Sequence, residues 1–320
     1  MGFLNSRTND LETQIAELQR TVEALAGQVS DLRLRQIVDE RIYTAFGERT
    51  WIPPLEPILP AETPFPRSST CTTADFFHPR FHALSKLIAI PPVWQRKLWE
   101  WIYIAHHLTN HLQPGSRGLG FGVGTEPLPA MLASLGAHIV ATDAPDDKGH
   151  WSIGQQWSAN IEGMRRPTII ADALLEQRVS FEPVDMNRIP GHLRDFDFTW
   201  SSCAFEHLGS IDAGLAFVEN SVATLKPGGL AVHTTEFNLS SSDATADHCD
   251  TVLFRRKDFD RLIERLRDLG HEVEPFEPGP ASYFLDNHVD VPPYTSDVHL
   301  KLRLCGYVST SAGIVVRRGG

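Results

Sequence analysis

The chain has 320 residues, of which 42% are hydrophobic and 22% charged, and its formal net charge at pH 7 is −11. This composition supports a sizeable folded core and argues against general disorder. The acidic excess argues against nucleic acid as the main partner, because binding to phosphates requires clustered Lys and Arg.

The four cysteines lie far apart and form no Cys-x-x-Cys pair. A disulfide framework or a zinc knuckle is therefore not expected, and reduced thiols indicate a cytoplasmic location. The first ten residues lack a basic stretch followed by an apolar run, and no stretch of 18 apolar residues occurs. We accordingly expect neither a signal peptide nor a transmembrane segment.

The N-terminal segment carries a heptad pattern. Its apolar residues recur at alternating steps of four and three: Leu11, Ile15, Leu18, Val22, Leu25, Val29 and Leu32. This stripe is narrower than the apolar face of a globular helix, although a helix packed on its own domain is the alternative. The β-branched residues share one seam position and the leucines the other, which favours a two-stranded coil over a trimer. We predict that residues 1–38 form a coiled coil that makes a homo-oligomer, a dimer or trimer.

Residues 39–112 are predicted to be a proline-rich connector followed by a helical cap. Six prolines fall between positions 53 and 66, which excludes a helix or a central strand there. Residues 97–112 are typical of a helix rich in aromatic residues and histidines. His107 and His111 have the spacing of a metal pair, but no HExxH pattern accompanies them, so we interpret them as ordinary helix residues.

Residues 113–320 change to an alternation of strands and helices. The predicted strands span 117–121, 138–142, 179–184, 196–201 and 230–235, the predicted helices span 126–135, 213–225 and 258–269, and 298–318 is expected to form an antiparallel pair. This alternation predicts a parallel sheet covered on both faces, which is the Rossmann-like α/β class. Ligands then bind at the carboxyl ends of the strands, near the switch in strand order.

A glycine loop with the sequence GLGFGVGTE follows the first of these strands. Its glycines Gly120, Gly122 and Gly124 allow a sharp turn and close approach of a ligand to the backbone. The next helix is expected to begin near Glu126, so its free N–H groups point at the same pocket. The spacing is GxGxG, which differs from the GxGxxG of dinucleotide-binding loops, and no P-loop Lys-Ser/Thr follows.

Two carboxylates end the next two strands. Asp143 lies 19 residues after Gly124, where a carboxylate accepts from both ribose hydroxyls of an adenosine ligand. Asp185 is placed to accept from the adenine amino group, while Met186 packs on the ring face. The alternative for each aspartate is a turn or capping carboxylate.

The ordered motifs GLGFGVGTE, Asp143, VDMN, TWSSCAFEHLGS and LKPGGLAVHTTEF resemble those of class I S-adenosylmethionine (SAM)-dependent methyltransferases. The resemblance covers residues 115–237 and implies a seven-stranded Rossmann-like sheet, SAM as the methyl donor, and a methyltransferase domain over 113–320. It also implies that Ser202 lies beside the cofactor. One position departs from the pattern: Gly118 stands where these enzymes often carry an acidic residue that holds the amino-acid part of SAM, and Glu126 is a candidate substitute.

Methyl transfer from a sulfonium is an in-line displacement, so the main task of the enzyme is alignment, and a hydroxyl acceptor also benefits from a base. His207 is the leading candidate for the general base. Glu236 and Glu206 are candidates to orient the acceptor or to act with His207. These three residues are alternatively a divalent-cation set, but no metal is predicted. Lys97, His78 and Asp75, and likewise His288, Asp290 and His299, are candidates to cover the pocket.

The sequence therefore predicts O-methylation of a hydroxylated acceptor, a small molecule such as a sugar or a glycan. An NAD-dependent oxidoreductase or epimerase shares the glycine loop and Asp143, but it would need GxGxxG and a Tyr-x-x-x-Lys pair. A non-catalytic coiled-coil assembly protein with a vestigial methyltransferase domain is the remaining alternative, and the intact glycine loop argues against it.

Overall fold

A computed structural model describes residues 15, 17–33, 52–145, 157–294 and 298–320. Contacts divide the chain into two units, one of residues 1–54 with 290–295 and the other of residues 55–289 with 296–320. This division joins most of the predicted connector and cap to the same unit as the sheet. Every helix among the described residues is too short or too polar to cross a bilayer.

The first unit contains a helix over residues 17–33. Six of the predicted seam residues are described, and 45–64% of the surface of each is exposed. Leu11 lies outside the described residues. The helix is confirmed over this range, whereas self-association remains a prediction.

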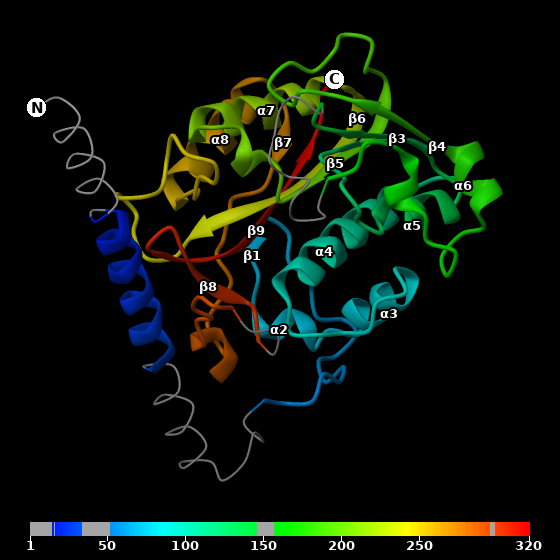
Figure 1. Ribbon diagram of the computed structural model, residues 1–320. Coiled ribbons are helices and arrows are strands. Elements are labelled where there is room, and N and C mark those ends of the chain that lie inside the picture. Colours follow the sequence, from blue (N-terminus) through cyan, green and yellow to red (C-terminus); the bar gives the residue numbers. More distant parts are fainter. Residues whose placement is uncertain (1–14, 16, 34–51, 146–156, 295–297) are drawn as a thin grey trace, which may run out of the picture. The chain divides into compact units, whose positions relative to one another are not determined.

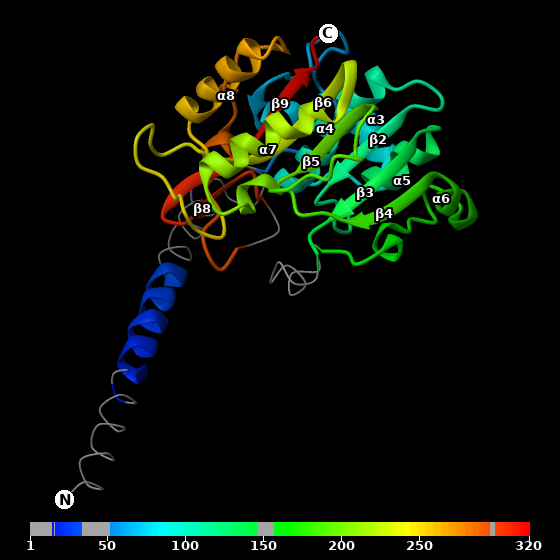
Figure 2. The ribbon, with the colours of Figure 1, turned by 90° about the horizontal axis from the view of Figure 1, so that it is seen from above.

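The second unit is built on one mixed sheet, with the strands side by side in the order β1-β9-β6-β5-β2-β3-β4 (Figures 1 and 2). The five parallel strands are β4 (Val179–Pro183), β3 (His138–Asp143), β2 (Arg117–Phe121), β5 (Phe196–Ser202) and β6 (Leu225–Asn238). The strand β9 (Tyr307–Arg317) runs antiparallel to β6. The strand order reverses at β2, between β3 and β5, which is where open α/β sheets bind ligands.

The prediction of seven strands is wrong, because the described part of the chain already forms a sheet of nine. The outer edge of β9 is shared by three short strands, β8 (Lys301–Leu304), β1 (Ser69–Thr70) and β7 (Glu272–Val273). These three strands come from separate parts of the chain and together occupy the edge that one long strand could fill. Two of them, β1 and β7, are only two residues long. The predicted connector thus contributes a strand to the sheet.

Helices cover both faces of the sheet, as the alternating pattern predicts. In Figure 1, α7 (Ile211–Ala223) and α8 (Arg256–Asp268) lie above the sheet, and α4 (Arg96–His111) and α3 (Pro79–Leu87) lie below it. The remaining helices are α2 (Thr73–Phe76), α5 (Leu128–Ser134), α6 (Asp172–Arg178) and the 3₁₀ turns η3 (Ile161–Met164), η4 (Phe205–His207) and η5 (Phe284–Asn287).

The two faces of β5 are packed differently. Ser201 faces α7, where its hydroxyl and that of Ser221 each lie 2.8 Å from a ring nitrogen of the fully buried His233. Phe198 and Trp200 face the α4 side, where they lie against the glycines of β2. On the α4 side of the sheet, the aromatic side chains of Phe198 and Trp200 therefore lie beneath the carboxyl ends of the strands.

Candidate functional site

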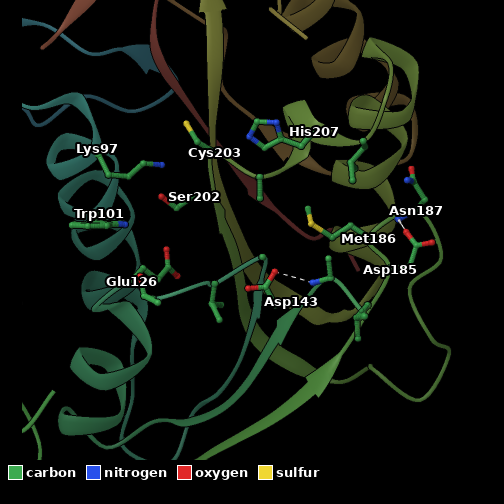
Figure 3. Close-up of a pocket in the computed structure, with 17 residues that line it drawn as sticks. Lys97, Trp101, Glu126, Asp143, Asp185, Met186, Asn187, Ser202, Cys203 and His207 are labelled. Carbon is green, nitrogen blue, oxygen red and sulfur yellow. Dashed lines mark hydrogen bonds between the residues drawn. The ribbon is translucent and has the colours of Figure 1, made fainter. Parts of the chain in front are cut away.

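A cavity of about 380 Å³ opens at the carboxyl ends of β2, β3 and β5, at the switch in strand order (Figure 3). Its volume is typical of small-molecule sites, which span ~300–1,000 Å³. In Figure 3, Lys97 and Trp101 of α4 lie on the left, Asp143 lies in the middle, and Asp185 and Asn187 lie on the right. The side chains at the two ends of the cavity thus differ in chemistry.

The glycine loop forms one wall of this cavity through Gly122, whereas Gly124 is not among the lining residues. Gly122 and Gly124 both have positive φ angles, +59° and +48°, which favour glycine. A Cβ at Gly122 would lie 2.8 Å from the Cβ of Ala204, so a side chain there would press on the opposite wall. Gly120 lies beneath Trp200 within β2 and is not among the lining residues, so its role in the structure is packing.

Asp143 is buried beside the cavity and is held by three backbone donors. Its Oδ2 accepts from the N–H groups of Gly124, at 3.0 Å, and Ser158, at 3.1 Å, and its Oδ1 accepts from Ala144 at 2.8 Å. Burial raises its pKa to about 6. A carboxylate has about four acceptor positions, so one remains on Oδ1. This leaves room for one ribose hydroxyl, where the sequence predicts two.

The expected adenine subsite lies at the other end of the cavity. Met186 is buried and lines the wall, and Asp185 lies at the rim with its Oδ1 accepting from the N–H of Asn187 at 2.9 Å. Asp143 and Asp185 therefore line one cavity with an apolar side chain available to cover a ring.

The end of β5 supplies Ser202 and Cys203 to the cavity. The hydroxyl of Ser202 lies 3.3 Å from Oε2 of Glu100. Cys203 has a φ of +45°, a conformation that is uncommon outside glycine. Burial raises the pKa of its thiol well above the usual value. The thiol is thus protonated and is not set up as a nucleophile.

His207 lies in the wall of the cavity at the end of η4. Its Nδ1 is 2.8 Å from the carbonyl oxygen of Asp250, an acceptor. A neutral ring with this partner carries its proton on Nδ1 and its lone pair on Nε2. The local geometry therefore suits a proton acceptor at Nε2.

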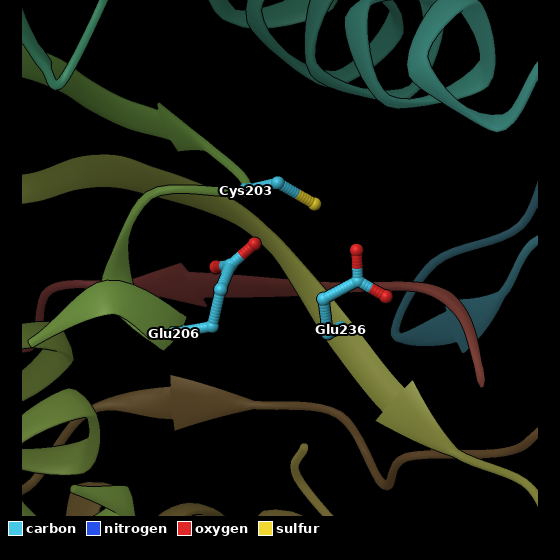
Figure 4. A group of neighbouring side chains, drawn as sticks. All are labelled: Cys203, Glu206 and Glu236. Atoms are coloured by element: carbon cyan, nitrogen blue, oxygen red, sulfur yellow. The ribbon is translucent and has the colours of Figure 1, made fainter. Parts of the chain in front are cut away.

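Glu206 and Glu236 are buried next to the cavity, but they are not among its lining residues. Their carboxylates lie close to the thiol of Cys203, with the ligating atoms within 4.8 Å of one another (Figure 4). Glu236 forms an ion pair with Arg96 and accepts from Ser309 at 2.6 Å, and Glu206 accepts from Thr235 at 3.0 Å.

These contacts can be compared with the alternative that His207, Glu206 and Glu236 bind a divalent cation. Among the described residues, the two glutamates cluster with Cys203, whereas the sequence placed them with His207. A guanidinium already balances the charge of Glu236, so a divalent cation would have to compete with Arg96. The cluster acts as a buried ionic network that fixes α4 against β6 and β9.

The helix α4 supplies site residues that the sequence analysis only partly identified. Lys97 lines the cavity, and its ammonium is 2.6 Å from Oε2 of the fully buried Glu100. Trp101, one turn further on, also lines the cavity and was missed. The sequence did contain a signal for Lys97. Glu100 lies on the face of this amphipathic helix that packs on the sheet, and a buried glutamate requires a cationic partner.

The other covering candidates lie elsewhere or have structural partners. Asp75 accepts from the indole of Trp99 at 2.8 Å, and His78 caps α3 through a hydrogen bond with Arg80. Neither residue lines the cavity, and nor do His288, Asp290 and His299.

The histidines of α4 lie in its C-terminal half, away from Lys97. His107 contacts the carbonyl oxygen of Pro66 at 3.1 Å, and His111 contacts that of Asp197 at 3.1 Å. Burial lowers the pKa of His107 to about 4. These contacts agree with ordinary helix residues that pack against other segments of the same chain.

Comparison with solved structures finds methyltransferases at low sequence identity. The magnesium protoporphyrin IX methyltransferase of Synechocystis PCC 6803, with bound S-adenosylhomocysteine (SAH), is 12% identical over 70% of this chain and 83% of that chain, with a TM-score of 0.43. The 1,6-didemethyltoxoflavin-N1-methyltransferase of Burkholderia thailandensis, also with SAH, is 15% identical over 71% and 80%, with a TM-score of 0.38. A putative methyltransferase of Bacillus halodurans C-125 is 14% identical over 68% and 99%, with a TM-score of 0.41.

No protein-family model and no curated protein sequence matches the chain. The residues of the cavity are what bear on function.

Proposed function

We propose that this chain is a SAM-dependent methyltransferase whose cofactor occupies the cavity at the switch in strand order. One observation carries the proposal. A glycine-lined wall, a buried carboxylate at the end of β3 and a methionine after β4 follow one another along a single cavity of about 380 Å³. An adenosine that carries an amino-acid chain needs these features in this order.

The chemistry of the lining residues fits this ligand. The open acceptor position on Asp143 suits a ribose hydroxyl, and the side chain of Met186 suits the face of adenine. Ser202 and Cys203, at the end of β5, lie between the two ends of the cavity (Figure 3). This position suits the sulfonium, where the bound cofactor would supply an electrophilic methyl group.

We further propose that the acceptor is a hydroxylated small molecule, such as a sugar or a glycan, and that His207 removes its proton. The Nδ1 contact with Asp250 directs the lone pair of the ring to Nε2. Transfer of the methyl group to a hydroxyl oxygen forms a C–O bond, breaks the C–S bond and releases one proton, which Nε2 accepts. Glu236 would act on the acceptor side by holding Arg96 and α4 in place, and Glu206 would act there from its place beside Thr235 of β6.

The organisation of the protein is part of the proposal. The domains would be 1–38 for oligomerisation, 39–112 as connector and cap, and 113–320 for catalysis. The homo-oligomer would form through the exposed seam of the N-terminal helix, and the location would be the cytoplasm.

Isothermal titration calorimetry with SAH and with NAD tests the assignment. We expect SAH to bind and NAD not to bind. Asp143→Asn should weaken SAH binding about tenfold to a hundredfold, since a hydrogen bond to a charged group contributes ~1.5–3 kcal/mol. The exposed Asp268→Asn variant is the matched control and should bind as the wild type does. Binding of NAD without SAH would replace the proposal with the oxidoreductase alternative.

A further inference from the structure

Glu126 is a buried acid in the wall of the cavity. Only 6% of its surface is exposed, and its Oε1 accepts from the indole N–H of Trp200 at 2.6 Å. Burial raises its pKa to about 8, so the carboxyl group of the ligand-free protein is largely protonated at pH 7. A buried acid of this kind gains a strong partner when a cationic group enters the cavity.

At Gly118, the strand β2 has no room for such an acid. A Cβ placed on Gly118 would lie 2.2 Å from Cε2 of Phe198 and 3.0 Å from Cδ1 of Ile139. Phe198 of β5 thus occupies the volume that a side chain at position 118 would need. A second aromatic residue of the same strand, Trp200, orients Glu126. The packing therefore excludes an acid at position 118 and holds one after the glycine loop.

Lys97 lies at the same end of the cavity as Glu126 (Figure 3). Its ammonium is fixed by Glu100, which also lies within hydrogen-bonding distance of the hydroxyls of Ser202 and Ser311. Lys97 is close enough to Glu126 to lower the pKa of that carboxyl group. An acid and a cation therefore face the cavity together, at the end away from Asp185.

We propose that Glu126 and Lys97 form a pair that recognises a free α-amino acid group, with Glu126 accepting from its ammonium and Lys97 donating to its carboxylate. This inference rests on the proposed function, because it assigns the α4 end of the cavity to the aminocarboxypropyl chain of the cofactor. Binding then ionises Glu126, and one proton leaves the protein for each ligand bound. Nucleosides without the amino-acid chain do not engage the pair.

Two nucleosides distinguish the contribution of Glu126 and Lys97 to binding from that of the rest of the site. SAH carries the aminocarboxypropyl chain, and 5′-methylthioadenosine carries the same adenosine thioether without it. In calorimetry on the full chain, Glu126→Gln and Lys97→Gln should each weaken SAH binding about tenfold to a hundredfold, as expected for a lost charged hydrogen bond. Both variants should bind methylthioadenosine within about threefold of the wild type. The exposed Glu264→Gln variant is the control for either ligand.

The proton provides an independent readout. Titrations of SAH at pH 7 in buffers of different ionisation enthalpy should show a proton released by the wild type and none by Glu126→Gln. Glu126→Gln preserves side-chain volume, and Lys97 is partly exposed, so thermal unfolding should confirm that both variants fold.

The outcomes are distinct. If the two variants leave the affinity for SAH unchanged, or weaken the binding of both nucleosides equally, Glu126 and Lys97 do not recognise the amino-acid group. The proposed function stands in that case. If the wild type binds neither nucleoside, the proposed function itself fails, and the pair fails with it.

Discussion

Trp200 donates its indole N–H to the buried carboxyl group of Glu126 across 2.6 Å, so a residue within β5 orients an acid beyond the end of β2. Trp200→Phe keeps the ring over Gly120 but removes this donor. We expect weaker SAH binding with little change for methylthioadenosine, because only the amino-acid end depends on Glu126. Calorimetry with both nucleosides measures this, and an unchanged SAH affinity would show that the indole only fills space.

Gly118 is required by packing. Gly118→Ala should destabilise the fold by ~1–3 kcal/mol, the usual cost of overpacking a core, because the new methyl group meets Phe198. Gly191→Ala is the matched control, since a Cβ there meets nothing within 4 Å. The cost should fall in a Phe198→Ala background. Urea unfolding of the wild type, Gly118→Ala, Phe198→Ala and the double variant measures the coupling, and equal costs in both backgrounds would contradict the clash.

His207 should matter for turnover and not for cofactor affinity. With a hydroxylated acceptor on which the wild type is active, His207→Gln should lower kcat by about 10²–10⁴, the usual contribution of a general base. Its SAH affinity should match that of the wild type. A wild-type kcat would assign His207 to packing, and a parallel loss of SAH affinity would assign it to the cofactor site.

His233 should make the fold sensitive to acid. Burial lowers its folded-state pKa to about 3, whereas an unfolded histidine titrates near 6.5. Below pH 6.5 the unfolded chain binds a proton that the folded chain does not, so stability is retained above that pH and falls as the pH drops towards 3.

The test compares the wild type with His233→Gln by urea unfolding at pH 7.5 and pH 5.5. The stability advantage of the wild type should shrink by about 1.4 kcal/mol on acidification, the linkage value for one site at one unit below its unfolded pKa. A constant difference would show that His233 is not the titrating group.

The exposed seam of the N-terminal helix should control the oligomeric state. Leu18→Asp with Leu25→Asp should reduce the mass measured by light scattering, because charges in the seam oppose association. Ala24→Asp with Ser30→Asp adds the same charge outside the seam and should leave the mass unchanged. Deletion of residues 1–35 should act like the seam variant. An unchanged number of subunits in both the seam variant and the deletion variant would refute the coiled coil.

Short-range sequence patterns anticipated much of the second unit. Gly122 of the glycine loop, Asp143 and Met186 line one cavity, because strand ends in a parallel sheet converge and their spacing is visible in the sequence. The predicted helix 97–112 corresponds to Arg96–His111, since sixteen residues carry a clear period.

The remaining features depend on contacts between distant segments. The two-residue strands β1 and β7 are too short to have a period of their own. Gly120 was predicted to contact a ligand, but it packs against Trp200, which lies eighty residues later in the chain. The partnership of Glu236 with Arg96 joins β6 to α4, and no local pattern in either segment indicates it.

The strand β1 pairs Ser69 and Thr70 with Gly313 and Ala312 of β9. A truncated protein that began near residue 113 would keep every motif that resembles the SAM-dependent methyltransferases. It would, however, leave the backbone of β9 unpaired at Ala312 and Gly313. Unpaired strand edges invite pairing with other chains. Expression of the catalytic region alone should therefore yield aggregates, and the shortest soluble form should begin before Ser69.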